Sequence, residues 1–269
     1  MNIAVLLTTF QKKDETLKCL GCLDNNNYRV KVFITDSNSK NNIEESIIEN
    51  PNIHFKNVGD DIYWNQGMIL AWKEAVKFKL DFDFYIWLNN DTYLYKDAIK
   101  TMIENFKSHK SDSLIVGTTQ YNNTLTYGGR VSFKGSIIEP SGSPEPVKII
   151  NGNCVLISRN IFKKLGFLNS KFSHSLGDID YGLRAIENKI KVYCTSKIIG
   201  ECMSNPYIWY QEKNLIDRIK ALNSPKGTPL NEYLYFNYYH FGVFNALKFL
   251  LASFFALLFP KFYKLLRSQ

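Results

Sequence analysis

Polar side chains stand directly after three short apolar runs of the chain, each at the point where a predicted β-strand ends. They are Thr9, Asp36 and the cluster Asn89, Asn90 and Asp91. A carboxylate at the end of a buried strand requires a partner or a ligand, because an isolated buried charge is costly. Asp91 suits a hard cation such as Mg2+ or Mn2+, which typically binds through one or two carboxylates together with phosphate oxygens. In the alternative interpretation, Asp91 caps a following helix and the two asparagines form a turn.

Asp36 occupies a position where α/β folds often place an acid on a ribose hydroxyl, although aspartates are also common turn formers. The segment after the first apolar run reads Thr8-Thr9-Phe10-Gln11. It contains neither the G-x-G-x-x-G of dinucleotide-binding proteins nor a P-loop, which argues against both of those chemistries. Neutralisation of a bound diphosphate would therefore depend largely on a metal ion.

Asp178 and Asp180 are two residues apart where a helix is predicted to begin. Backbone amides and the helix dipole favour ionised carboxylates at that position. An ionised carboxylate is what a general base requires when a hydroxyl loses its proton as it attacks. The alternative is a helix cap with acidic residues in the first turn.

The elements that position these groups alternate between strand and helix. Apolar, β-branched runs and helical stretches succeed one another in the order strand 3–8, helix 14–23, strand 30–35, strand 53–57, helix 66–79 and strand 84–88. Such alternation predicts an α/β fold with a doubly wound, mostly parallel sheet. Ligands of open α/β sheets bind at the carboxyl ends of the strands, so the three polar clusters are expected to share one crevice. Further strands are predicted at 114–118, 125–127 and 154–158, with helices at 160–165 and from 175 to about 188.

The excess of positive charge is concentrated in an apolar C-terminal tail. The formal net charge is +8, and residues 244–269 carry four basic side chains and no acidic one, which indicates a membrane surface rather than nucleic acid. Residues 241–260 are apolar but interrupted by Asn245 and Lys248, whereas a spanning helix needs about 20 apolar residues. The pattern predicts an amphipathic helix in the headgroup plane. The alternatives are a helix docked on the core or, less favoured, a membrane span.

Five unevenly spaced cysteines favour reduced thiols over a disulfide framework. Met1 leads directly into a strand without a basic region before it, so no signal peptide is expected. The predicted location is the cytoplasm, with peripheral attachment to the inner face of the cell membrane.

Taken together, the motifs resemble the inverting family-2 glycosyltransferases of GT-A fold, including rhamnosyltransferase-like enzymes of bacterial capsule and O-antigen assembly. The resemblance rests on AVLLTTF, FITDSNS, GDDIYWNQGMILAW, FYIWLNNDT, NGNCVLISRNIFKKLGFLN and HSLGDIDYGLRA. It implies a GT-A domain over residues 1–225, followed by an amphipathic membrane-interface segment over residues 226–269.

The resemblance also implies roles for individual residues. Asp178 would be the catalytic base, and Asp91 would bind Mg2+ or Mn2+. Nucleotide-sugar contacts would come from Thr9, Asp36, Asp60, Trp64, Gly67, Asn89 and Asn90. Acceptor or supporting contacts would come from Asp180, Asn151, Gly152 and Trp209.

The implied activity is inverting transfer of one hexose or deoxyhexose from a nucleotide-diphosphate donor, a UDP- or dTDP-sugar, to a lipid-linked saccharide acceptor. Asn89 and Gly177 stand where the family pattern has acids, the first of its D-x-D motif and the Glu before the base. These departures leave open a catalytically degenerate scaffold or saccharide-binding subunit. A sugar nucleotidyltransferase is the other alternative, although a Gly-rich basic loop after the first strand is missing.

Overall fold

The computed structural model describes residues 1–23, 28–37, 43–47, 49–109, 112–204 and 208–267. The chain forms two compact units. The first comprises Met1–Ser170 and Asp178–Ser204, and the second comprises Lys171–Gly177 and Asn205–Gln269. The domain boundary predicted after residue 225 stays a prediction, and each unit is described below by itself.

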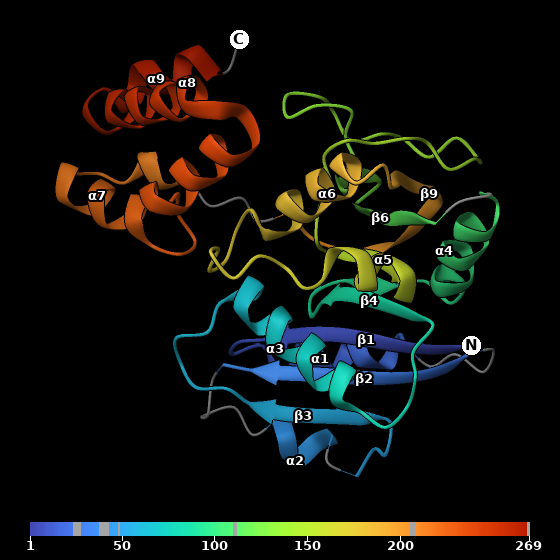
Figure 1. Ribbon diagram of the computed structural model, residues 1–269. Helices are drawn as coiled ribbons and strands as arrows, with labels where there is room; N and C mark the ends of the chain where they lie inside the picture. The colour runs from blue at the N-terminus through green and yellow to red at the C-terminus, as the bar shows by residue number, and fades with distance from the viewer. Residues whose placement is uncertain (24–27, 38–42, 48, 110–111, 205–207, 268–269) are drawn as a thin grey trace. The chain divides into compact units, whose positions relative to one another are not determined.

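The first unit is built on a sheet whose strand order is β3-β2-β1-β4-β8-β6-β9-β5, with β7 paired to β6. The described strands are β1 (Asn2–Thr9), β2 (Arg29–Asp36), β3 (Ile53–Asn57), β4 (Phe84–Asn89), β5 (Tyr93–Leu94), β6 (Ser113–Tyr121), β7 (Thr124–Tyr127), β8 (Cys154–Ser158) and β9 (Lys191–Glu201). Strands β1 to β4 are parallel to one another, and Figure 1 shows β1, β2 and β3 side by side. The prediction of a mostly parallel doubly wound arrangement is confirmed for this half of the sheet.

Helices cover both faces of the sheet. They are α1 (Lys13–Gly21), α2 (Ile43–Ile47), α3 (Trp64–Lys77), α4 (Ala98–Lys107), α5 (Arg159–Leu165) and α6 (Gly177–Glu187). Along β1 the side chains alternate between two cores: Ala4 and Leu6 pack with α3, α5 and α6, whereas Ile3, Val5 and Leu7 pack with α1, α2 and α4. Burial on both faces explains why β1 reads as a continuous apolar run.

Several elements differ from the sequence expectation. Helix α3 begins at Trp64, two residues earlier than predicted, and it ends at Lys77. Strand β9 and helix α4 were not predicted: β9 carries polar residues such as Lys197 within its length, and its pairing with β6 supplies the stabilisation that its own pattern does not signal. Strand β8 is antiparallel to its neighbours β4 and β6, so the sheet is mixed.

The second unit is helical. Its described elements are the short helix η1 (Trp209–Gln211), α7 (Leu215–Asn223), α8 (Leu230–Leu258) and α9 (Pro260–Arg267). A small core forms from Trp209, Ala221, Leu222, Ala256 and Leu257. The guanidinium of Arg218 donates to the carbonyl of Leu257, which ties α7 to the end of α8. The C-terminal helix predicted at 241–260 is present as part of the longer apolar helix α8.

Helix α8 is broken at Gly242, whose φ of 82° and ψ of 174° are not helical. Glycine adopts this left-handed φ readily because it lacks a Cβ atom. By length and composition, Leu230–Leu258 would be long and apolar enough to cross a membrane, and only 22% of its most apolar stretch is buried within the protein. The break divides this element into a shorter helix before Gly242 and a longer one over residues 243–258.

Candidate active site

Strand register brings the predicted site residues to one edge of the sheet in the first unit. Thr9 lies opposite Asp36 in the β1–β2 pair, and β4 ends beside β1 at Asn89. Because β8 is antiparallel to β4, with Cys154 opposite Leu88, the turn before β8 lies at the same edge. This turn contains Asn151 and Gly152, two further predicted site residues. The predicted residues at these strand ends therefore lie at one edge of the sheet, as expected.

Asp178 is held in a fixed orientation at the start of α6. The amide of Gly152 donates to its Oδ2 at 2.7 Å, and the amide of Ile179 donates to its Oδ1 at 2.9 Å. Burial raises the pKa of the Asp178 carboxyl, and these amide hydrogen bonds oppose the rise only in part. A carboxylate that is held in place and has a raised pKa is a stronger base than an ordinary aspartate.

Trp64, Asn89 and Gly152 pack together beside Asp178. The indole Nε1 of Trp64 donates to Asn89 Oδ1 at 2.7 Å. A Cβ atom at Gly152 would lie 2.6 Å from the Trp64 ring and 3.2 Å from Asp178 Cβ, so the close approach requires glycine. The amide oxygen of Asn89, which stands where the family pattern has an acid, therefore holds the Trp64 ring.

Asn90 connects the end of β4 to the segment after β1. Its Nδ2 donates to Thr9 Oγ1 at 3.2 Å and to Thr16 Oγ1 at 3.0 Å, and the two hydroxyls are 2.9 Å apart. Thr9 and Thr16 are buried. Thr9 and Asn90 thus belong to a neutral hydrogen-bond network that joins the segment after β4 to the end of β1 and to α1.

Asp91 is partly accessible to solvent, with its side chain 37% exposed. Its Oδ2 is 3.1 Å from Lys12 Nζ, and its Oδ1 is 3.8 Å from the Sγ of Cys202. Burial raises the pKa of the Cys202 thiol to about 11, so this sulfur is protonated at neutral pH. Although burial acts to lower the pKa of Lys12, the hydrogen bond and charge of Asp91 raise it.

The single carboxylate of Asp91 is compatible with a metal ion whose other ligands are phosphate oxygens and water. No cluster of three or more His, Cys, Asp or Glu side chains able to hold a metal is found in the described part of the chain. A single accessible carboxylate is still compatible with Mg2+ or Mn2+, since these ions commonly take one or two carboxylates and complete their shell with phosphate and water. The metal-binding role of Asp91 stays a prediction that its accessible carboxylate is compatible with.

Two nucleotide candidates are buried, and a third is exposed. Asp36 is only 1% exposed at the end of β2. Gly67 is buried where α3 crosses β1 and β2, and a Cβ atom there would lie 2.4 Å from Thr8 Oγ1, so glycine is needed for packing. Asp60 is exposed in the loop between β3 and α3. The nucleotide roles of these three residues stay predictions.

The supporting candidates lie in different environments. Asn151 accepts a hydrogen bond from the amide of Asn153 and so forms the turn before β8. Asp180 is fully buried and receives a 2.8 Å hydrogen bond from Arg184. Trp209 is 8% exposed in the core of the second unit, and its proposed acceptor contact would require an exposed ring face.

Sequence reasoning missed three side chains that contact Asn90 or Asp91. These are Lys12, Thr16 and Cys202. Lys12 and Thr16 lie soon after Thr9, in the loop and in the first turn of α1, so a search of this segment for basic and hydroxyl side chains would have found them. Cys202 carries no comparable signal, because β9 brings it to the site across the sheet.

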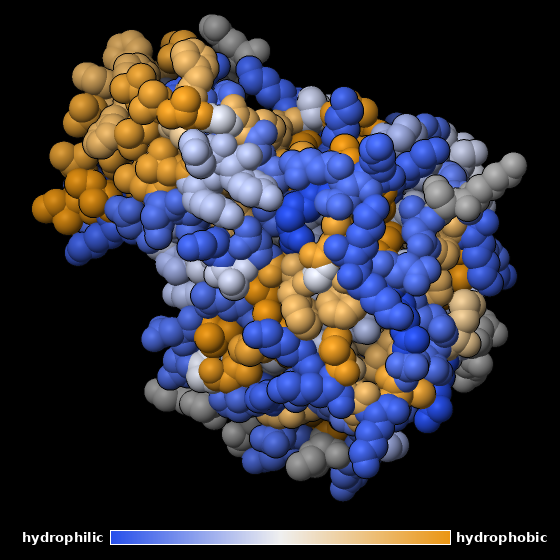
Figure 2. All heavy atoms as spheres, in the orientation of Figure 1, coloured by the Kyte–Doolittle hydropathy of each residue, from blue (hydrophilic) through white to orange (hydrophobic). Residues whose placement is uncertain are grey.

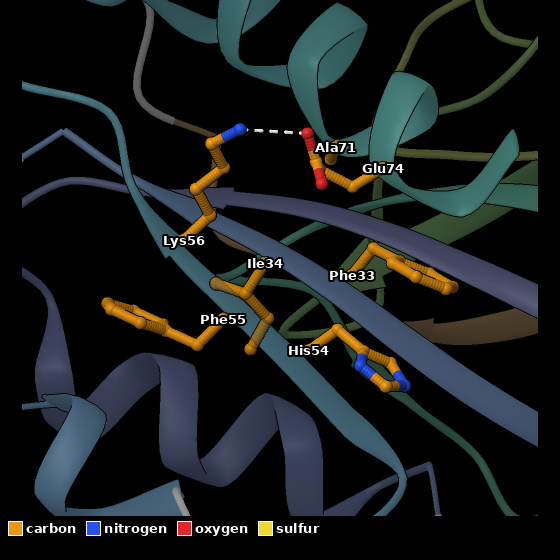
Figure 3. Close-up of a pocket in the computed structure, with 7 residues that line it drawn as sticks. All are labelled: Phe33, Ile34, His54, Phe55, Lys56, Ala71 and Glu74. Carbon is orange, nitrogen blue, oxygen red and sulfur yellow. Dashed lines mark hydrogen bonds and ion pairs between the residues drawn. The ribbon is translucent and has the colours of Figure 1, made fainter. Parts of the chain in front are cut away.

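A small pocket lies away from this cluster, between β2, β3 and α3. Figure 3 shows its seven lining residues, with Ala71 and Glu74 contributed by α3. Its volume is about 200 Å³, and Lys56 and Glu74 form a 2.8 Å ion pair at its rim. None of the predicted site residues is among the seven, so the pocket supplies no support for the site.

Solved structures share the fold of this chain at low sequence identity. A crystal structure of S. aureus TarS 1-349 has a TM-score of 0.58 and 15% identity, covering 89% of this chain and 72% of that one. TarS 1-349 in complex with UDP-GlcNAc gives 0.57 and 13%, covering 89% and 73%. A further TarS structure gives 0.56 and 15%, covering 88% and 44%. No match is found among curated proteins.

The family model described as "Glycosyl transferase family 2" matches residues 4–166, more than half of the chain. This segment contains β1 to β4 and the turn before β8, which together form the polar edge. The predicted fold class is confirmed: a mixed α/β, GT-A-like fold with an apolar C-terminal helix. The chain belongs to glycosyl transferase family 2.

Proposed function

We propose that this chain transfers one sugar from a nucleotide-diphosphate donor to a saccharide hydroxyl with inversion at the anomeric carbon, and that Asp178 is the general base. The observation that carries the proposal is the placement of Asp178. Its carboxylate is fixed by the Gly152 and Ile179 amides at the same sheet edge as the end of β4.

The reaction is a direct displacement. The acceptor oxygen forms a bond to the anomeric carbon while the bond from that carbon to the diphosphate breaks, through an oxocarbenium-like transition state. Asp178 accepts the hydroxyl proton, and the nucleoside diphosphate departs with the bonding electron pair. Because the raised pKa of Asp178 strengthens it as a base, the carboxylate is matched to a weakly acidic hydroxyl.

We propose that the donor is a UDP- or dTDP-sugar bound along the edge formed by Thr9, Asp36, Asp60, Trp64, Gly67, Asn89 and Asn90. A structural neighbour was solved in complex with UDP-GlcNAc, which supports a uridine donor. Asp91 would hold Mg2+ or Mn2+, and such an ion, when bound, stabilises negative charge on a departing diphosphate. Asp180 supports α6 from the interior through Arg184.

Replacement of Asp178 tests the assignment. We expect Asp178→Asn to lower turnover by about a hundredfold to ten-thousandfold while UDP affinity stays unchanged, because the base acts only in the chemical step. Asp97→Asn is the matched control, since Asp97 stands at the start of α4. Normal turnover by Asp178→Asn would refute the role. A wild-type protein that binds UDP-sugars but transfers none would favour the scaffold alternative.

We further propose that the acceptor is lipid-linked and that the second unit attaches to an anionic membrane surface. Large apolar side chains are exposed on α7, α8 and α9, and Figure 2 shows hydrophobic residues gathered over these C-terminal helices. On the second part of α8 they are Val243, Phe244, Leu247, Leu251, Phe254, Phe255 and Leu258. Lysines accompany this face, and the sequence contains no acidic residue after Glu232, which suits anionic headgroups.

The break at Gly242 favours attachment in the interface over a membrane span. Residues 243–258 span about 24 Å at 1.5 Å per residue, which is shorter than a hydrocarbon core of roughly 30 Å. Ala256 and Leu257 on this helix are buried in the core of the second unit, so one of its faces is already covered by protein. We therefore propose that residues 226–269 lie on the cytoplasmic membrane surface. From the resemblance of the motifs, we propose a pathway of capsule or O-antigen type such as rhamnosyl transfer.

A further inference from the structure

The ammonium group of Lys12 forms an ion pair with the carboxylate of Asp91, which we propose as the metal ligand. Lys12 Nζ is 3.1 Å from Asp91 Oδ2, and the two side chains are 45% and 37% exposed. Both partners can therefore exchange with ions and ligands from solvent. The ammonium has to move from this oxygen before a divalent ion can coordinate it.

The chain positions that carry Lys12 and Asp91 are tied together. The amide and the hydroxyl of Thr16 both donate to the carbonyl of Lys12, at 3.0 Å and 2.6 Å. Asn90, the neighbour of Asp91 in the chain, donates to the same Thr16 hydroxyl at 3.0 Å. The Lys12 backbone is thus anchored, while its long side chain remains able to change partner near Asp91.

We infer that Lys12 holds Asp91 in the donor-free protein and thereby makes metal binding depend on a nucleoside diphosphate. This inference rests on the proposed function. Without a diphosphate, a divalent ion has to displace the ammonium from Oδ2 or bind Oδ1 beside it, and in both cases the like charges repel. A diphosphate supplies anionic oxygens for the metal and for the ammonium at once, so each ligand raises the affinity of the other by the same factor.

The test measures Mn2+ binding to the full chain by electron paramagnetic resonance, first without nucleotide and then with UDP. We expect Lys12→Met to bind Mn2+ alone up to about fivefold more tightly than wild type, since the competing ion pair is removed. The gain in Mn2+ affinity caused by UDP should shrink in the same variant. Adding Asp91→Asn to Lys12→Met should abolish the tightened binding, which identifies the site.

Lys56→Met is the matched control, because Lys56 forms an ion pair of similar length and exposure with Glu74 away from this site. It should bind Mn2+ as wild type does. Equal or weaker binding of Mn2+ alone by Lys12→Met would overturn the inference. Failure of the wild type to bind UDP, with or without Mn2+, would instead count against the proposed function. The Mn2+ affinities of wild type and Lys12→Met without nucleotide would still test whether Lys12 competes with the metal.

Discussion

The two compact units place their apolar side chains in opposite ways. In the first unit, successive residues of β1 are buried in cores on both faces of the sheet, and polar groups at the strand ends bond to one another. In the second unit, the core is small, and the large side chains of α8 after Gly242 are mostly exposed. In the first unit, the apolar side chains of β1 are buried and the polar groups at the strand ends are hydrogen-bonded within the protein. The second unit leaves an apolar face exposed, which contact with lipid would stabilise.

The contrast separates the two tasks that we propose for the chain. Chemistry belongs to the unit in which side chains are held by short hydrogen bonds, since catalysis requires fixed geometry. Attachment belongs to the unit whose exposed face needs no exact partner, because burial of apolar surface is not directional. Variants that disturb one unit should leave the other task intact.

Apart from replacement of Asp178 itself, the largest effect is expected from Gly152→Ala. A methyl group at this position would press on the Trp64 ring and on Asp178, and displacement of a catalytic group by about 1 Å can cost about a hundredfold in turnover. Turnover of the purified variant with a UDP-sugar is the measurement. Membrane binding should not change.

Gly21→Ala is the control, because a Cβ atom there meets nothing within 4 Å. Near-normal turnover by Gly152→Ala would contradict the close packing of Trp64 against the base and would weaken the comparison between a rigid unit and an adaptable one.

A smaller effect is expected from Leu251→Glu in the second unit. Burial of a leucine side chain contributes roughly 1.5–3 kcal/mol, so the charged variant should partition onto anionic vesicles at least about tenfold more weakly. Co-sedimentation with such vesicles is the measurement, and turnover on a soluble acceptor should be retained. Val131→Glu, at an exposed apolar position of the first unit, should bind vesicles as wild type does. Unchanged sedimentation of Leu251→Glu would contradict the proposal that this face of α8 contacts the membrane.

The smallest effect is expected in the pH dependence of stability. The folded state raises the pKa of Asp178, so its stabilising contribution is present below the ordinary aspartate pKa of about 3.9 and is lost as pH rises through the folded value. The melting temperature of wild type relative to Asp178→Asn should therefore fall between acidic and neutral pH. A wild type that gains on the variant as pH rises would contradict burial of the base.

Much of the first unit follows from local pattern. The apolar runs before Thr9, Asp36 and Asn89 predict their strands and the shared edge, because strand order and direction in an alternating α/β chain are strongly restricted. The observed bounds of β3 and β8 equal the predicted ones. Strand β9 was not predicted, because its pairing with β6 stabilises it and its own hydrophobic pattern does not indicate a strand.

The local partners of the site could be predicted only in part. The sequence identifies Asn89 as a departure from an acid pair, but only the packing reveals that its oxygen holds the Trp64 indole. Likewise, the pair formed by Lys12 and Asp91 joins residues 79 positions apart. Such contacts depend on side-chain directions at adjacent strand ends, which periodicity does not specify.

The supports of the Lys12–Asp91 pair and the pair itself should respond differently to ionic strength. Thr9, Thr16 and Asn90 are joined by neutral hydrogen bonds, which dissolved ions screen little. The exposed ion pair is weakened as the Debye length falls from about 10 Å at 0.1 M salt to about 3 Å at 1 M. Raising the salt concentration should therefore loosen the contact between Lys12 and Asp91 while the surrounding hydrogen bonds stay in place.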